Sequence, residues 1–129
     1  PLQVLLDSLP RLSAAFTEDK FYHLWEYHGD TTVFSAIATH GDSAISRLVD
    51  ALDDTAASRS TADGHPVPAG VMYNQALKRM AYYEWDCGSN PSQPLCAGFI
   101  HPNATNAQLR AAKRAWREAL AKNIVIRTE

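Results

Sequence analysis

Five histidines are the residues best able to bind a metal ion or to carry a proton near neutral pH. His23 and Glu26 are three positions apart, so a helix would place the imidazole and the carboxylate on one face. Together they would supply two ligands, whereas a zinc ion takes three or four from a protein. His23 and His28 are five positions apart, not the four of the helical metalloprotease motif. The sequence therefore predicts no metal site and no cofactor.

Ser43 is the serine whose neighbours best suggest a nucleophile. The run Gly41-Asp42-Ser43 is similar to the GDS start of the SGNH hydrolase signature, in which the serine attacks the substrate. That family also has an aspartate and a histidine near the C-terminus, but the last histidine here is His101, in a turn-prone segment. A helix capped by Asp42, with Ser43 in its first turn, explains the same residues by local structure alone. We therefore predict no catalytic residue.

Charged and aromatic residues offer a different kind of site, a surface that binds another protein. Three aspartates lie at the end of an expected helix, where their charge opposes the helix dipole. A histidine and a proline follow in a loop that displays them, and two aromatic residues precede the cysteines. The predicted partner-binding residues are Asp50, Asp53, Asp54, His65, Pro66, Tyr82 and Trp85. A basic stripe on the last expected helix is interpreted mainly as its polar face: Arg110, Lys113, Arg114 and Arg117.

The two cysteines, Cys87 and Cys96, frame a segment with two prolines, a glycine and an asparagine. Those residues favour turns, so the ends of the segment can meet and a disulfide is predicted. Neither a histidine nor an acid lies between the cysteines, which argues against a metal site in this loop. A disulfide indicates an oxidising compartment, so we expect a periplasmic or secreted protein. Two reduced cysteines in a cytosolic protein are the alternative.

The elements that would carry these residues are mostly helices, judged by the spacing of apolar residues. The triplet His-Gly-Asp occurs twice, and each copy is typical of one helix ending at glycine and the next beginning at aspartate. The segment between the copies, residues 31–39, fits a helix, with a strand as the alternative. Further helices are predicted near residues 2–12, 17–28, 42–54, 71–85 and 105–122, with a long surface loop over 55–68 and an extended segment at 124–126.

Residues 41–54 resemble the second helix of a HEAT-like repeat, in which a Gly-Asp turn leads into an A-[IV]-x-x-L-[IV]-x-A-L stripe closed by aspartate. Residues 71–80 look like the first helix of the next unit, although the proline-containing loop between them departs from the pattern. The resemblance covers about a third of the chain. It implies an all-α fold of five to six short helices in stacked antiparallel pairs. The length of 129 residues suits a single domain over residues 1–129. It adds no catalytic residue.

Composition narrows the classes of function. The formal net charge of -2 argues against a nucleic-acid-binding protein, and no apolar run is long enough to span a bilayer. We therefore expect a domain that binds another protein, such as a toxin or an enzyme, and performs no catalysis; a homodimer is left open. By analogy, a bacterial immunity protein or an inhibitor fits the size and compartment. The alternative is a small hydrolase or metal-dependent enzyme that uses Ser43, or His23 with Glu26.

Overall fold

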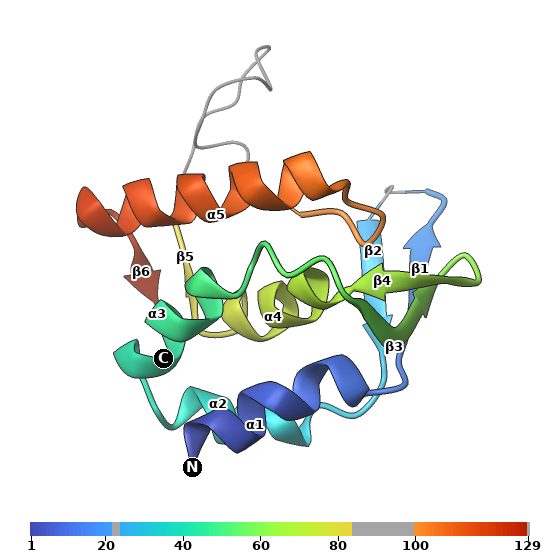
Figure 1. Ribbon diagram of the computed structural model, residues 1–129, viewed down its shortest axis with the longest axis horizontal. Helices are drawn as coiled ribbons and strands as arrows, with labels where there is room; N and C mark the ends of the chain where they lie inside the picture. Colours follow the sequence, from blue (N-terminus) through green and yellow to red (C-terminus); the bar gives the residue numbers. More distant parts are fainter. Residues whose placement is uncertain (22–23, 84–99, 129) are drawn as a thin grey trace.

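The computed structural model describes residues 1–21, 24–83 and 100–128 (Figure 1). In chain order the elements are α1 (Leu2–Ser8), the 3₁₀ helix η1 (Leu9–Arg11), β1 (Ala15–Asp19), β2 (Leu24–His28), α2 (Thr32–Ala38), α3 (Asp42–Asp50), β3 (Ala57–Ala62), β4 (His65–Pro68), α4 (Ala69–Leu77), β5 (Ala81–Tyr82), α5 (Asn106–Ala121) and β6 (Ile126–Arg127). The other helices lie around α4, and the larger sheet lies at one end (Figure 1). The prediction of an all-α fold with stacked HEAT-like helix pairs is therefore wrong, because the protein is a mixed α/β fold.

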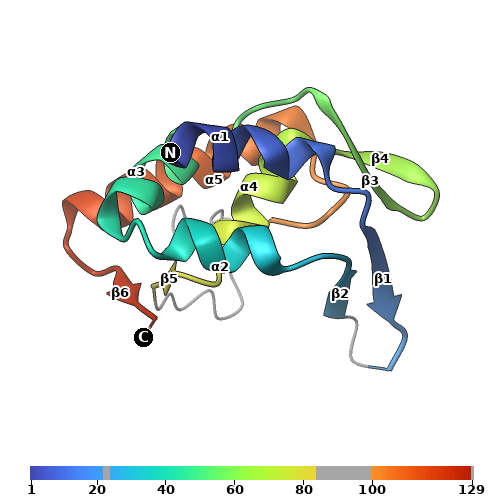
Figure 2. The same cartoon turned by 90° about the horizontal axis from the view of Figure 1, so that it is seen from below.

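Four strands form a mixed sheet in the order β2-β1-β3-β4. β1 and β2 make an antiparallel hairpin that is paired along all five residues of each strand. β3 and β4 make a second antiparallel hairpin. A short parallel pairing joins the two hairpins, in which Ala15 and Phe16 of β1 lie opposite Thr61 and Ala62 of β3. Beyond this junction the hairpins diverge, as Figure 2 shows.

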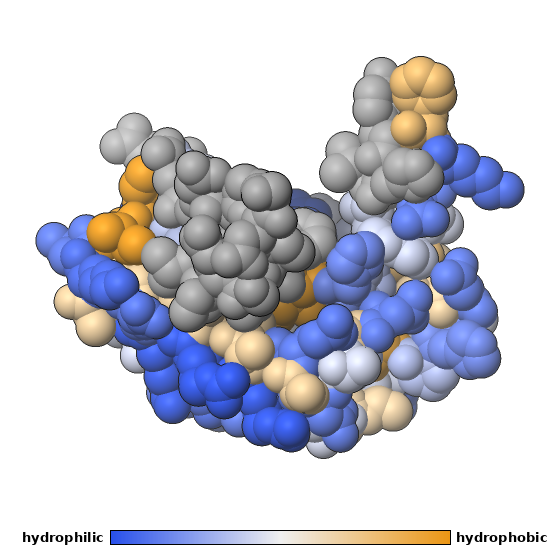
Figure 3. Space-filling view, turned by 90° about the horizontal axis from the view of Figure 1, so that it is seen from above, coloured by the Kyte–Doolittle hydropathy of each residue, from blue (hydrophilic) through white to orange (hydrophobic). Residues whose placement is uncertain are grey.

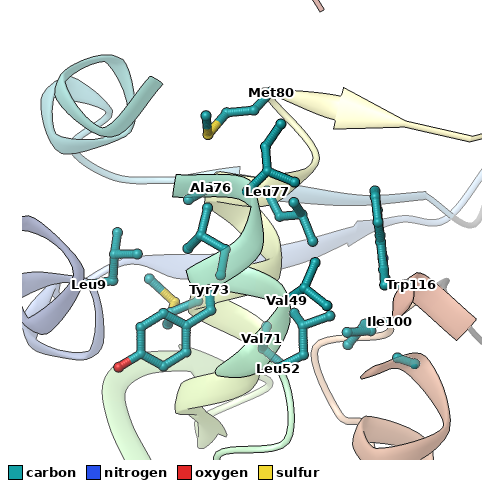
Figure 4. Close-up of a cluster of buried hydrophobic side chains, with 14 of the residues drawn as sticks. Leu9, Val49, Leu52, Val71, Tyr73, Ala76, Leu77, Met80, Ile100 and Trp116 are labelled. Atoms are coloured by element: carbon teal, nitrogen blue, oxygen red, sulfur yellow. The ribbon is translucent and has the colours of Figure 1, made fainter. Parts of the chain in front are cut away.

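Helix α4 is the centre of the hydrophobic core, and all nine of its residues are buried. Apolar side chains from η1, from α3 and the residues just after it, from the segment before α5 and from α5 pack with it in one cluster, among them Leu9, Val49, Leu52, Ile100 and Trp116 (Figure 4). The start of α4 requires glycine, since a Cβ on Gly70 would lie 2.1 Å from the carbonyl oxygen of Leu52. The helix predicted over 71–85 is thus present, but it ends at Leu77.

Residues 17–28, predicted to be a helix, form most of the β1–β2 hairpin instead. Trp25 and Tyr27 pack against the core while Glu26 and His28 are exposed, which is the alternation of a strand with one buried face. In the expected helix, Phe21 would share a buried face with Leu24 and Trp25. In the structure its side chain is 81 % exposed, in the turn after β1. The prediction failed because so short a run of apolar residues fits both the helical and the strand period.

Residues 55–68, predicted to be a surface loop, contain the second hairpin. Asp63 and Gly64 have φ angles of 53° and 80° and close its two-residue turn. Positive φ at both positions is the type I′ geometry that an Asp-Gly pair favours. The buried residues of β3 are Ser58, Ser60 and Ala62. Because these side chains are small or polar, the strand shows no apolar alternation in the sequence.

Several local predictions are confirmed. Residues 31–39 contain α2 rather than a strand, and Gly41, with φ of 57°, links it to α3. The cap expected from Asp42 is not formed, because Gly41 is the N-cap residue and Asp42 Oδ1 instead accepts a hydrogen bond from Arg127. The capping box at the start of α5 is present, because the side chains and backbone N–H groups of Thr105 and Gln108 bond reciprocally. The closing extended segment contributes β6, which pairs with β5. The first His-Gly-Asp triplet differs from prediction, since its histidine ends β2 and not a helix.

Candidate protein-interaction surface

The chain just after β1 carries an exposed aromatic side chain. Phe21 is 81 % exposed, more than any other large hydrophobic residue in the described ranges. Its backbone N–H donates a hydrogen bond to Asp19 Oδ1 (2.8 Å), so an Asx turn holds the chain at this point. The space-filling view shows the projection at the upper right, with a hydrophobic group at its tip (Figure 3). Aromatic side chains displayed in this way are enriched in protein interfaces.

The base of this hairpin is fixed by aromatic contacts that continue into the helices. The Tyr27 ring makes edge-to-face contacts with Phe16 at 5.5 Å and with Phe34 of α2 at 5.3 Å. The Arg79 guanidinium lies 4.7 Å from the Phe34 ring centroid and 5.9 Å from that of Tyr27. The Tyr27 hydroxyl donates to the Asp30 carbonyl oxygen (2.8 Å), and burial, followed by the Asp30 charge, raises the pKa of the phenol. The hairpin is therefore packed on the core at its base.

A groove of about 410 Å³ lies between the two hairpins. Its lining comes from β1 and the residue after it, and from the end of β3 with the turn that follows: Ala15, Phe16, Thr17, Glu18, Lys20, Thr61, Asp63 and Gly64. The β1 residues are consecutive and belong to both faces of the strand, so the groove runs along the backbone edge of β1. Two acidic side chains and one basic side chain give the lining a formal charge of -1.

The solvent-facing side of the β1–β2 hairpin brings a hydroxyl, an imidazole and a carboxylate together. Thr17 Oγ1 lies 2.8 Å from His28 Nε2, and Glu26 Oε2 lies 3.7 Å from the same nitrogen. A catalytic triad needs the acid on one ring nitrogen and the nucleophile on the other, because the imidazole has to be oriented while it takes the proton. Here both partners meet one nitrogen and all three side chains are exposed. This group is a polar surface cluster.

The predicted acidic cluster at the end of α3 contacts the basic stripe of α5. Asp50 Oδ1 lies 2.8 Å from Arg117 Nη2, and Asp53 Oδ1 lies 3.1 Å from Lys113 Nζ. Asp54 accepts a backbone hydrogen bond in the segment that leads to β3. The sequence alone predicts the acids and the bases as separate surfaces. Partners that are 67 and 60 positions apart give no local signal of their contact.

The other predicted partner-binding residues are spread over the structure. His65 and Pro66 are exposed on β4, directly after the turn that forms one side of the groove. Tyr82 is exposed on β5, opposite the exposed Ile126 of β6. Outside the described residues lie Trp85, Cys87 and Cys96, and with them the predicted disulfide. Of this set, His65 and Pro66 are therefore the ones next to the groove. The exposed Phe21 was missed because the helical spacing assigned it to a buried face.

The residues of the enzymatic alternative lie on different elements. Ser43 is exposed in the first turn of α3, and helix α2 stands where the hydrolase pattern requires a strand. Glu26 is exposed on β2, whereas His23 falls outside the described residues. Within the described ranges, no group of three or more His, Cys, Asp or Glu side chains is placed to hold a metal ion.

A second hollow, of about 250 Å³, lies beside α1 and α3 and is lined by Gln3, Leu6, Arg47, Asp50, Ala51 and Tyr73. Its charged groups already have partners in the chain, because Arg47 donates to Gln3 and Asp50 pairs with Arg117. Burial raises the pKa of the Tyr73 phenol, which stays neutral near physiological pH. Small-molecule sites usually have volumes of about 300–1,000 Å³, which is larger than this hollow. The groove between the hairpins is therefore the better candidate for a binding site.

A scan against protein-family models, a search of curated proteins and a search of solved structures each found no match. Across residues 1–21, 24–83 and 100–128, none of the helices combines the length and apolar character that a membrane crossing requires. The function of the chain is therefore inferred from its surface.

Proposed function

We propose that the chain is a protein-binding domain that occupies a site on another protein and performs no catalysis itself. The observation that carries this proposal is Phe21, exposed at the tip of a hairpin whose base is packed on the core. Removing a phenyl ring from water when a partner binds contributes about 1.5–3 kcal/mol. The partner we propose is a toxin or an enzyme met in the periplasm or outside the cell, as for immunity and inhibitor proteins.

The charges around the hairpin favour a protein over a polyanion. Glu18, Asp19 and Glu26 lie on its two strands, and Lys20 follows β1. Nucleic acids and anionic lipid surfaces attract clusters of lysine and arginine and are repelled by an excess of carboxylates. A protein partner can match this mixture, with apolar contact at the centre of the interface and charged groups at its rim.

The aromatic packing at the base of the hairpin supports the same proposal. Tyr27 is held between Phe16 and Phe34, and Arg79 covers the Phe34 ring. A surface that is already ordered loses less conformational entropy when it binds, so more of the contact energy remains as affinity. Phe21 thus lies two residues beyond a strand that is packed on the core.

The test places a photo-crosslinking phenylalanine analogue at position 21, in protein produced in its native host. A matched control carries the same analogue at Val4, which is 67 % exposed on α1, outside the hairpin. We expect one dominant protein adduct from position 21 and none from position 4. The captured partner should then bind purified Phe21→Ser at least about tenfold more weakly than wild type, and Val4→Ser with unchanged affinity.

Both substitutions change exposed side chains, so the melting temperature should stay within the range of ordinary surface mutations. Weaker binding by Phe21→Ser therefore reports lost contact and not unfolding. Equal adducts from the two positions, or equal affinities of Phe21→Ser and wild type, would show that the hairpin tip is not the contact surface.

A further inference from the structure

The edge of β1 that faces the groove continues beyond its neighbouring strand. β1 pairs with β3 through Ala15 and Phe16, whereas it pairs with β2 along its full length. β3 ends at Ala62, and the chain turns back at Asp63 and Gly64. The last three residues of β1 therefore run past the end of β3, where the two hairpins separate (Figure 2). An added strand in this place would continue the line of β3.

The backbone groups of Glu18 point into the groove. The N–H of Thr61 donates a hydrogen bond to the carbonyl oxygen of Ala14 (2.9 Å), so the backbone at residue 14 faces β3. Every second residue of a strand directs its N–H and C=O to the same side, which places Glu18 on the β3 side and the odd-numbered residues on the β2 side. The register with β3 ends at Phe16 and Ala62, so no residue of β3 lies opposite Glu18.

The two outer edges of the sheet are less suited to strand addition. β4 has proline at two of its four positions, Pro66 and Pro68, and proline has no N–H to donate. The segment before α5 lies beside β2 (Figure 1). The Trp25 ring contacts His101 of this segment, with ring centroids 6.3 Å apart. The edge of β1 is instead bordered by the groove of about 410 Å³.

We propose that this edge of β1 binds an extended, basic segment of the partner protein by strand addition, a proposal that rests on the protein-binding function above. Backbone N–H and C=O groups aligned along a strand edge are matched by another extended backbone. The groove contains Glu18 and Asp63 with one base, Lys20, so lysine or arginine in the segment is attracted. The exposed Phe21 follows Lys20 directly, just beyond the residues that line the groove.

A capped peptide of alternating valine and lysine, about eight residues long, is the probe, because it favours an extended form and carries the required charge. Added to the isotope-labelled full chain, it should shift the amide resonances of residues 16–20 and 61–64 and slow hydrogen exchange at Glu18. Replacing its lysines by glutamate should weaken binding about threefold to tenfold. Methylating alternate backbone nitrogens of the Val-Lys peptide removes its donors, and should weaken binding at least about tenfold.

Two substitutions at one position separate the backbone from the side chain. Glu18→Pro removes the N–H that faces the groove and leaves the odd-numbered residues, which bond to β2, in place. Glu18→Ala removes the carboxylate alone. Strand addition predicts that Glu18→Pro loses probe binding, whereas Glu18→Ala weakens it about threefold. The amide spectrum and melting temperature of Glu18→Pro establish whether it folds; if it does not, the methylated peptide tests the same hydrogen bonds on the wild-type protein.

Equal binding of the methylated and unmodified peptides, or resonance shifts confined to the helices, would overturn strand addition. Tighter binding of the glutamate peptide would overturn the assignment of a basic segment. If crosslinking at position 21 captures a partner that binds Glu18→Pro and wild type equally, the protein-binding function holds and strand addition does not. If position 21 captures nothing while the Val-Lys peptide orders the Glu18 amide, strand addition holds and the hairpin-tip function does not.

Discussion

Lys113 Nζ lies 3.1 Å from Asp53 Oδ1, and this contact joins the last helix to the segment that follows α3. The Lys113 side chain is 17 % exposed, so the pair is partly shielded from water. One turn further along α5, Arg117 pairs with Asp50 at 2.8 Å, but those side chains are 56 % and 59 % exposed. Helix α5 therefore forms one ion pair with the end of α3 and another with the segment after α3, and the two pairs differ in their exposure to water.

The shielded pair should contribute more to stability than the exposed pair. In a double-mutant cycle of Lys113→Met and Asp53→Asn, we expect a coupling free energy of about 1 kcal/mol; for Arg117→Met and Asp50→Asn we expect about 0.3 kcal/mol. Urea unfolding measures both cycles. Repeating them at high salt should reduce the coupling of the exposed pair most, because its charges are the more easily screened. Equal coupling free energies would show that the difference in burial does not change the contribution of the two pairs to stability.

Ser60 is fully buried, and its hydroxyl joins β3 to the segment between η1 and β1. Oγ donates to the Leu12 carbonyl oxygen (2.5 Å) and accepts from the Ala14 N–H (3.0 Å). Ser60→Ala removes the partner of both backbone groups, so the free energy of unfolding should fall by about 2 kcal/mol. Ser46→Ala, at an exposed position of α3, is the control and should change it by less than about 0.5 kcal/mol. Similar losses in denaturant unfolding would contradict the bridging role of Ser60.

Gly70 and Gly41 should respond differently to alanine. A Cβ at position 70 would lie 2.1 Å from the Leu52 carbonyl oxygen, and α4 cannot shift without disturbing the core. Gly70→Ala should therefore cost about 3 kcal/mol of stability. At Gly41 no atom beyond the adjacent residues lies within 4 Å of the added Cβ, so the cost is the backbone strain at φ of 57°, about 1–2 kcal/mol. The order of the two melting temperatures checks this, and Gly41→Ala melting first would refute it.

The sequence was informative where the physical signal acts within a few residues. The capping box of Thr105 and Gln108 and the glycine link at Gly41 are of this kind, and both are present. It was misleading where tertiary packing decides. Ser58 and Ser60 are buried in β3 although nothing in their polarity predicts it. Asp63-Gly64 was the available hairpin signal, and the surrounding prolines outweighed it in the loop interpretation.

The candidate groove could not be predicted from the sequence. It exists because β1 pairs in parallel with β3 at Ala15 and Thr61, 46 positions away, and because the register then ends. No local pattern specifies where such a pairing stops. Phe21 was visible as an apolar residue, but its exposure depends on the strand that replaces the expected helix.

Tyr83 gives the last prediction, a loss of stability at alkaline pH. Its ring is 2 % exposed and perpendicular to that of Trp116, with centroids 4.8 Å apart. Burial, followed by the charge of Glu118, raises the pKa of Tyr83 to about 12 from the ordinary value of 10.0. Between these two values the unfolded chain releases the phenolic proton and the folded chain retains it. This contribution to stability is therefore complete below pH 10 and is lost as the pH approaches 12.

Tyr83→Phe removes the titrating phenol and keeps the ring, so its free energy of unfolding should fall less steeply than that of wild type between pH 10 and 12. Tyr82→Phe is the control, because it changes an exposed neighbour and leaves Tyr83 in place. Its slope should match that of wild type. Urea unfolding at several pH values in this interval provides the comparison. If Tyr83→Phe has the wild-type slope, burial does not raise the pKa of the Tyr83 phenol in the folded chain.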